Sequence, residues 1–159
     1  MDRVKNIIEN KKYIKYLKKN EKREENRIYC KHSLEHAIDT ARIAQIINLE
    51  NSLNIDKSLI YAAALLHDIG KWKQYEKGIP HEIASSSIAK VILEECSFSE
   101  EEISMIVEAI SEHRRKEENP VDLKGVISLG DKLSRNCFYC SAKEKCNWDD
   151  EKKNKSIYY

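Results

Sequence analysis

The chain has 159 residues, with 28 Lys or Arg and 27 Asp or Glu, and a formal net charge of +1. This length suggests one domain with its own hydrophobic core, and the near-neutral charge excludes a globally basic nucleic-acid-binding protein, although not a local basic patch. Only 4 glycines and 2 prolines are present, which disfavours a turn-rich β fold and favours long helices.

Helical periodicity begins near the N-terminus. Apolar residues at helical spacing predict an amphipathic helix over residues 3–18 that packs on a larger core. A stripe of small residues over 33–49 predicts a second helix that a neighbouring helix approaches closely. Asp56 is positioned to cap a third helix, which begins near Lys57 and stops at Gly70 as its C′ residue. Because this helix is apolar around most of its circumference, we expect it to be the central buried helix.

The second half of the chain continues the helical pattern. One helix begins near His81 and includes Val91 in its apolar face, and Ser99 with Glu102 forms a capping box for the next helix. Asp122 opens the last helix. About six helices and no strand result, so the fold class that we predict is all-α, a single-domain helical bundle.

No segment predicts a membrane span or an export signal. The longest apolar run covers residues 59–66, whereas a membrane span needs about 20 residues. No apolar stretch follows the N-terminus that would serve as a signal peptide, so we expect a cytoplasmic protein. Five cysteines, an odd number, then predict thiols or metal ligands and not a disulfide framework.

A histidine and an aspartate, His67 and Asp68, directly follow the most apolar helix. If this pair is buried it needs a partner, and a divalent cation is one such partner. The alternative is an exposed final helical turn in which both side chains meet solvent. The pair is not isolated, because His36 lies thirty-one residues upstream of His67 and Asp131 lies on the last predicted helix.

Three segments resemble the HD-domain superfamily of metal-dependent phosphohydrolases. They are residues 36–41 (HAIDTA), 63–71 (AALLHDIGK) and 130–135 (GDKLSR). The order His, His-Asp, Asp is the defining set of that family, and the resemblance spans about residues 28–136. It implies that one metal ion is held by His36, His67, Asp68 and Asp131. Imidazole and carboxylate ligands suit a divalent transition metal, namely Mn, Fe, Co, Ni or Zn.

Two further histidines resemble those of dinuclear family members. His81 resembles the histidine of the fourth helix and His113 that of the fifth, which implies a second ion with Asp68 as the bridge. The alternatives are a helix-capping role for His81 and a hydrogen-bonded core position for His113. His32 and His36 share a helical face, so either can be the first ligand, and His36 fits the family spacing better. For His32 we weigh a position beside the site or facing the substrate against an exposed position at the start of a helix.

The resemblance implies hydrolysis of a phosphoester or phosphoanhydride by metal-activated water, with Asp68 as a catalytic ligand. Lys71 and Arg114 are the leading candidates to bind the phosphate of a small phosphorylated substrate, for which we expect a nucleotide. Weaker candidates, whose alternative is a solvated surface charge, are Arg115, Lys132 and Arg135.

The substrate and even the reaction class stay open on the sequence. The acidic pair of guanosine-polyphosphate hydrolases and the Gly-Tyr-Pro signature of cyclic-dinucleotide members are absent. The chain resembles small stand-alone bacterial HD proteins, some of which cleave dinucleoside polyphosphates. Alternatives are a di-iron oxygenase of the HD type and a non-catalytic sensor that binds a metal or a nucleotide. We find no strong nucleic-acid signal, and the oligomeric state is open, a homo-oligomer included.

Cysteines gather after the last helix, where Cys137, Cys140 and Cys146 form a C-x2-C-x5-C run. Such spacing chelates a soft metal, and Cys30 would complete a tetrahedral set; the alternative is small buried hydrophobic residues in the last helix. With residues 27–32, the run resembles a clostridial-type subgroup of HD proteins.

The three parts that we expect are an N-terminal helix packing on the core (1–27), the HD metal-binding domain (28–136) and a cysteine-containing extension with a charged tail (137–159). Mostly charged residues at 20–26 and 149–156 are expected to be solvated, the second stretch as a frayed tail.

Overall fold

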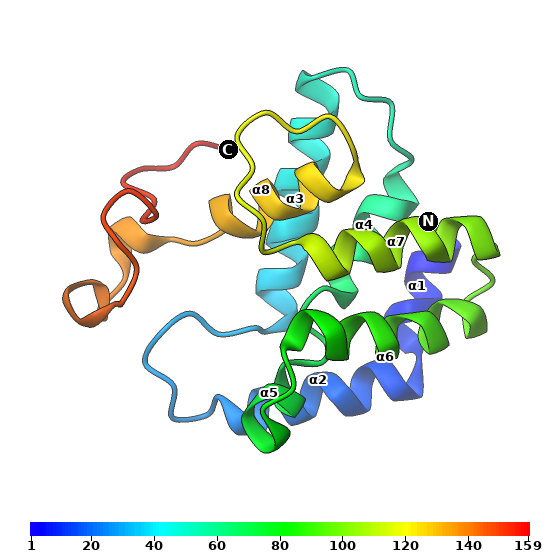
Figure 1. Cartoon of the computed structure of the whole chain (residues 1–159), viewed down its shortest axis with the longest axis horizontal. Helices are drawn as coiled ribbons and strands as arrows, with labels where there is room; N and C mark the ends of the chain where they lie inside the picture. The colour runs from blue at the N-terminus through cyan, green and yellow to red at the C-terminus, as the bar shows by residue number, and fades with distance from the viewer.

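A computed structural model describes all residues, 1–159, as helices joined by loops, with no strand (Figure 1). The all-α fold class predicted from the sequence is therefore confirmed, although the helices number eight rather than about six. They are α1 (Asp2–Glu9), α2 (Lys11–Arg23), α3 (Leu34–Glu50), α4 (Lys57–Leu66), α5 (Lys71–Lys77), α6 (His81–Glu95), α7 (Glu100–Glu112) and α8 (Leu123–Leu133), followed by two short 3-10 turns, Cys137–Tyr139 and Lys143–Lys145.

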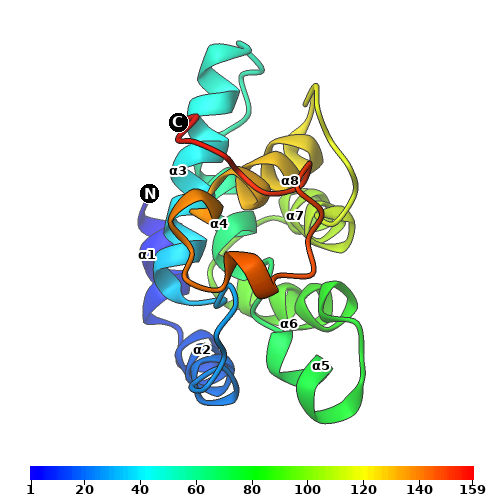
Figure 2. The same cartoon turned by 90° about the vertical axis from the view of Figure 1, so that its left-hand side faces the viewer.

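The helix α4 is the centre of the bundle, as its apolar composition predicts. It contacts α1, α3, α7 and α8, and these helices surround it in Figure 2. The small residues of α3, Ala37, Ala41 and Ala44, are buried and allow α8 to approach closely. A Cβ atom added at Gly130 of α8 would lie 2.9 Å from the carbonyl oxygen of Thr40. Because Gly130 has no Cβ atom, α8 can lie directly against the backbone of α3.

Local capping signals define most helix boundaries. The side chain of Asp56 accepts a hydrogen bond at the start of α4, that of Asp122 does so for α8, and Ser99 with Glu102 forms the predicted capping box of α7. The prediction of one helix over residues 3–18 is wrong. The side chain of Asn10 accepts hydrogen bonds from the next helix, so α1 ends there and α2 begins.

The stretch 20–26 is solvated as predicted at five of its seven residues, and the exceptions are Asn20 and Glu24. Asn20 and Glu24 are each only 1% exposed, because both side chains point into the bundle. The Asn20 amide nitrogen donates to the carbonyl oxygen of Asp68 at 2.9 Å, and its oxygen accepts from the amide of Trp72 at 2.8 Å. These bonds satisfy buried backbone groups around the His67–Asp68 turn and tie α2 to it.

Gly70 has a different role from the predicted helix C′ residue. Its φ is −92°, and it starts the short helix α5, which the sequence did not predict. A Cβ atom there would lie 2.4 Å from the amide nitrogen of Ser85 and 2.6 Å from the carbonyl carbon of Ala84. The glycine therefore permits close contact between the His67–Asp68 turn and α6.

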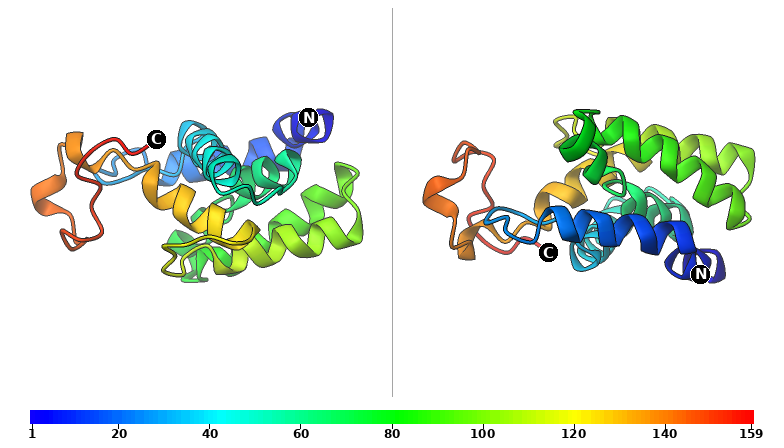
Figure 3. Two further views of the ribbon diagram at one scale, coloured as in Figure 1. Left: turned by 90° about the horizontal axis from the view of Figure 1, so that it is seen from above. Right: turned by 90° about the horizontal axis from the view of Figure 1, so that it is seen from below.

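The residues after α8 form an extension beside the loop that precedes α3 (Figure 3). The Tyr29 hydroxyl donates to the carbonyl oxygen of Lys145 at 3.1 Å, which joins loop and extension. The expectation of a frayed tail is wrong at Asn154, which is 4% exposed and donates to two carbonyl oxygens at the end of α8. Val91, predicted to be buried, is 42% exposed. None of the eight helices has both the length and the apolarity to cross a membrane.

Candidate metal centre

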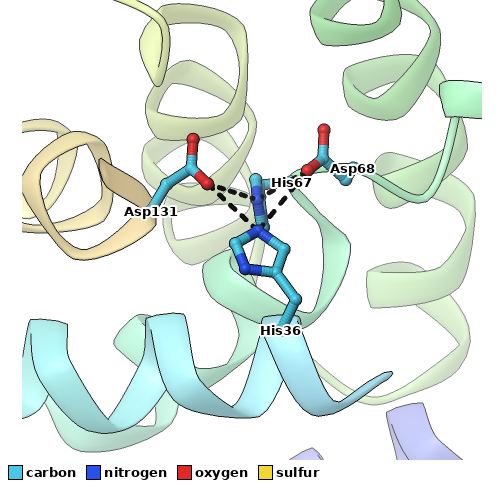
Figure 4. A group of neighbouring side chains, drawn as sticks. All are labelled: His36, His67, Asp68 and Asp131. Carbon is cyan, nitrogen blue, oxygen red and sulfur yellow. Dashed lines mark ion pairs between the residues drawn. The ribbon is translucent and has the colours of Figure 1, made fainter. Parts of the chain in front are cut away.

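Four side chains from three segments of the bundle meet at its centre (Figure 4). His36 comes from the first turn of α3, His67 and Asp68 from the turn after α4, and Asp131 from α8. One nitrogen or oxygen atom of each lies within 4.8 Å of the others. The shortest pairs are His67 Nε2 to Asp68 Oδ2, 2.9 Å, and His36 Nε2 to Asp131 Oδ1, 3.0 Å.

A second group of potential ligands shares Asp68 with the first. His81 begins α6 and His113 follows α7, and each offers one atom to a group within 4.8 Å that includes Asp68. The Asp68 Oδ1 atom lies 3.2 Å from His81 Nε2 and 3.9 Å from His113 Nε2. The other carboxylate oxygen, Oδ2, faces His36 and His67. One aspartate thus presents an oxygen to each of two adjoining groups.

The donor set fits a divalent cation. Buried polar atoms normally have a hydrogen-bond partner, yet His36 Nε2, His67 Nε2 and Asp68 Oδ1 make no hydrogen bond, since the carboxylate oxygens 3.0 Å from His36 Nε2 and 2.9 Å from His67 Nε2 do not have hydrogen-bond geometry. The Nδ1 atoms of His67 and His113 point at the carbonyl oxygens of Ala64 and Ile110, at 2.7 Å and 2.6 Å. A proton on Nδ1 leaves each Nε2 as an acceptor that faces the cluster. A cation in the first group would satisfy the two histidine nitrogens, and a cation in the second group would satisfy Asp68 Oδ1.

The pKa values in the cluster reflect burial and the charges of neighbouring side chains. Burial alone would raise the pKa of Asp68, but the nearby histidines, His67 first, hold it well below its usual range. Burial would lower the pKa of His67, but Asp68 and Asp131 raise it to about 10. Burial and Arg135 lower the pKa of His36 to about 4. A histidine must be deprotonated to bind a metal, so an incoming cation displaces the proton of His67.

His32 lies beside this cluster and not on the surface, which corrects the exposed alternative. Its side chain is 9% exposed, and its Nε2 atom is 3.9 Å from Asp68 Oδ2. Glu24 holds it through two contacts, 2.5 Å to His32 Nδ1 and 2.7 Å to its amide. The four-residue group contains His36 and not His32. Sequence reasoning missed Glu24 because it lies within a charged stretch.

A cavity of about 200 Å³ opens onto both groups. Its lining includes Asp68, His81, His113 and Asp131, so one space reaches both sets of ligands. It also includes cationic and aromatic side chains, which are Arg27, Lys71, Arg114, Arg135, Tyr29 and Trp148. Three of these, Arg27, Tyr29 and Trp148, carry no sequence signal that marks them as site residues. The cavity is therefore acidic at its base and cationic around it.

Lys71 and Arg114, the two leading phosphate-binding candidates, both line this cavity. The Lys71 ammonium is 3.3 Å from His81 Nδ1. This histidine nitrogen lies closer to Gln74 Oε1, at 2.8 Å. A proton on Nδ1 donates to Gln74, so Lys71 has no acceptor there. Burial lowers the pKa of Lys71. Arg114 is 61% exposed and 3.6 Å from Glu82. Both cations have capacity to bind an anion.

The three weaker cation candidates have separate roles. Arg115 pairs with Glu117 and Asp122 in the loop after α7 and does not line the cavity. Lys132 also lies outside the cavity lining. Arg135 is buried and contacts the site directly, with Nη2 3.0 Å from Asp131 Oδ1. It therefore holds the Asp131 carboxylate in position.

The structure places this chain in the class of helical proteins that can hold a divalent metal, because histidines and aspartates from separate helices converge on one cavity. Residues 29–136 match the family described as HD domain. The chain therefore belongs to the HD-domain family, as the sequence motifs indicated, and members of this family are typically metal-dependent phosphohydrolases.

Comparisons with known proteins place the chain among bacterial relatives. It is 52% identical over 160 residues to an uncharacterized protein of Clostridium beijerinckii, and the match covers the whole of both chains. Ribonuclease Y of Mycoplasma mycoides subsp. mycoides SC is 29% identical over 106 residues, 67% of this chain and 19% of the relative. Ribonuclease Y of Clostridium botulinum strain Hall is 33% identical over 99 residues, 62% of this chain and 17% of the relative. No solved structure matches the chain significantly.

Proposed function

We propose that the protein is a metal-dependent phosphohydrolase that cleaves a phosphoester or phosphoanhydride bond of a nucleotide. The observation that carries the proposal is the cavity of about 200 Å³, in which two ligand groups that share Asp68 lie beside four cationic side chains. A site with this charge distribution binds a phosphate group next to a metal ion.

One set of residues would bind the metal ions, and another set would bind the substrate. His36, His67, Asp68 and Asp131 would hold one divalent ion, and Asp68, His81 and His113 a second. Such ions, when bound, make hydroxide available from water near neutral pH and neutralise charge on phosphoryl oxygens.

Cationic side chains supply the remaining contacts with the substrate. Lys71 and Arg114 bind the phosphate oxygens from the cavity wall. Arg135 positions Asp131 through its 3.0 Å contact.

Two aromatic residues favour a nucleotide over a simple phosphate ester. Tyr29 and Trp148 line the same cavity as the cations, and aromatic rings stack on nucleobases. The relatives named ribonuclease Y act, by that name, on RNA, whose backbone is a phosphodiester. An oligoribonucleotide therefore belongs among the substrates to be tested.

The test combines metal analysis with a substrate screen. Protein purified without added metal is analysed for each element, and it is then incubated with nucleoside mono-, di- and triphosphates, dinucleoside polyphosphates and a short oligoribonucleotide. We expect a divalent transition metal and turnover of at least one of these compounds. Metal-loaded protein that binds a nucleotide and cleaves none would identify a sensor, and mixed-valent iron with oxygen consumption would identify an oxygenase.

Replacement of His113 by Ala tests the second ion. We expect the affinity for the second ion to fall by at least about 100-fold. Loss of a residue that only hydrogen-bonds to a metal ligand costs about 10- to 100-fold in metal affinity, and loss of a direct ligand should cost more. The first ion should remain, since His113 is absent from the four-residue group. Metal content per chain measures both effects. The neighbouring substitution Glu112→Gln, at a side chain 43% exposed, should retain the wild-type content. Equal metal content in the two variants would refute the two-ion arrangement.

Replacement of Lys71 by Met tests the phosphate contact. We expect kcat/KM to fall about 10- to 150-fold, because a hydrogen bond to a charged group contributes about 1.5–3 kcal/mol. Metal content should not change, since Lys71 is not in either ligand group. Steady-state kinetics on the identified substrate measure the effect. Lys77→Met at the exposed end of the same helix is the control, and equal kinetics for the two variants would contradict the assignment.

A further inference from the structure

Four of the five cysteines lie outside the core and take no part in the metal centre. Cys30 is in the loop before α3, and Cys137, Cys140 and Cys146 are in the extension after α8. The fifth, Cys96, is buried at the end of α6. None is part of a disulfide.

The three cysteines of the extension lie on two short turns that contact each other. Cys137 starts the first 3-10 turn, and the Cys140 amide donates to the Cys137 carbonyl oxygen at 3.3 Å. Side chains three residues apart on a 3-10 turn lie on the same side of it. The second turn contacts the first and ends at Cys146, whose amide donates to the Lys143 carbonyl oxygen. Cys137 and Cys140 are thus not residues of the last helix.

Cys30 lines cavities in common with the three cysteines of the extension. It lines one cavity together with Cys137 and Cys140, and a second cavity together with Cys146. Hydrogen bonds hold the two segments in contact, from Arg135 Nη1 to the Lys31 carbonyl oxygen and from the Tyr29 hydroxyl to the Lys145 carbonyl oxygen.

The electrostatics agree with this proximity. Burial raises the pKa of the Cys30 thiol, Arg135 lowers it, and each of the other three cysteines raises it. All three are therefore close enough to Cys30 for their charges to act on it. Ionisation of Cys30 is therefore disfavoured in the absence of a cation, and a divalent cation reverses this preference.

We propose that Cys30, Cys137, Cys140 and Cys146 bind one zinc ion, separate from the histidine–aspartate centre. Four cysteines with a C-x2-C pair form a closed tetrahedral structural site, with zinc–sulfur distances of about 2.3 Å. Binding converts four thiols to thiolates and releases four protons. The sulfur atoms are not yet as close together as the ligand atoms of the metal centre, so the side chains turn inward as the ion binds.

The ion would fasten the extension to the loop that carries His32. Trp148 lies two residues after Cys146 and lines the cavity over the metal centre. The zinc site therefore fixes one wall of that cavity without contributing a ligand to its base.

Zinc content of the full chain tests the proposal. We expect one zinc per chain to be lost in Cys140→Ser and in Cys30→Ser, with the metal of the histidine–aspartate centre retained. In Asp68→Ala the thiolate-bound zinc should stay. Cys96→Ala, which removes a thiol distant from the cluster, should keep wild-type zinc, and circular dichroism checks that each variant is folded. A zinc content unaffected by Cys140→Ser would overturn the proposal.

Cobalt substitution of the wild-type chain provides a second readout that needs no variant to fold. Tetrahedral thiolate coordination gives sulfur-to-cobalt charge-transfer absorption, which we expect in the wild type and in Asp68→Ala but not in Cys140→Ser. Absence of this absorption in the wild type would refute the site. A Cys137–Cys140 disulfide found by mass spectrometry, or iron with labile sulfide in place of zinc, would also overturn the assignment.

Discussion

Replacement of Asp68 by Ala is expected to remove both ions of the metal centre and to lower kcat by more than about 10³-fold, because bound metal supplies several kcal/mol of transition-state stabilisation. Asp68 is the one residue common to both ligand groups, and its two carboxylate oxygens face different histidines. The helix content should not change, since the carboxylate accepts no hydrogen bond that holds a helix together. Element analysis, circular dichroism and kinetics measure the three quantities.

Asp39→Ala is the matched control for this substitution. Asp39 is in the same bundle, on α3, but its side chain is 49% exposed and its nearest charged partner is Arg42, at 3.8 Å. The control should keep wild-type metal content and kcat. Full metal occupancy in Asp68→Ala would contradict the assignment of the centre.

Replacement of Gly70 by Ala is expected to destabilise the fold by about 1–3 kcal/mol, the usual cost of overpacking a closely packed site. The added methyl group would lie 2.4 Å from the amide nitrogen of Ser85, so α6 must move away. Since α6 carries His81, occupancy of the second ion should fall while the first ion remains. Denaturant unfolding and element analysis measure the two effects.

Gly78→Ala separates this contact from a general effect of adding a methyl group. Nothing lies within 4 Å of a Cβ atom at Gly78, although its φ is +67°. The left-handed backbone costs about 1–2 kcal/mol, and the second ion should be retained. The interpretation of Gly70 fails if Gly70→Ala keeps both ions and wild-type stability.

Helix boundaries and the central helix were predictable because their causes are local. The caps at Asp56, Ser99 and Asp122 act on amides two or three residues away, and the apolar circumference of α4 is visible in its own sequence. The break at Asn10 was missed because asparagine fits either a helix surface or a cap, and only the tertiary position of α1 selects the cap.

Residues around the metal centre were predictable to a lesser extent. The motifs of the family resemblance single out His36, His67 and Asp131, which the structure brings together from three separate segments. Glu24 has no such motif, because its partner His32 lies across a loop and a charged stretch looks the same whether it is solvated or folded inward. The cavity wall formed by Trp148 depends on how a non-periodic extension folds back, which no spacing rule predicts.

The two hydrogen bonds of Asn20 bear on where a stable unit of this protein begins. Residues 29–136 contain every member of both ligand groups, yet they exclude α1 and α2. A chain shortened to that range would leave the Asp68 carbonyl and the Trp72 amide without their present partner, at the turn that presents the shared carboxylate. It would also uncover the face of α4 that α1 now covers. The N-terminal helices therefore support the candidate metal centre, and we expect the smallest stable folding unit to be larger than the segment that matches the family.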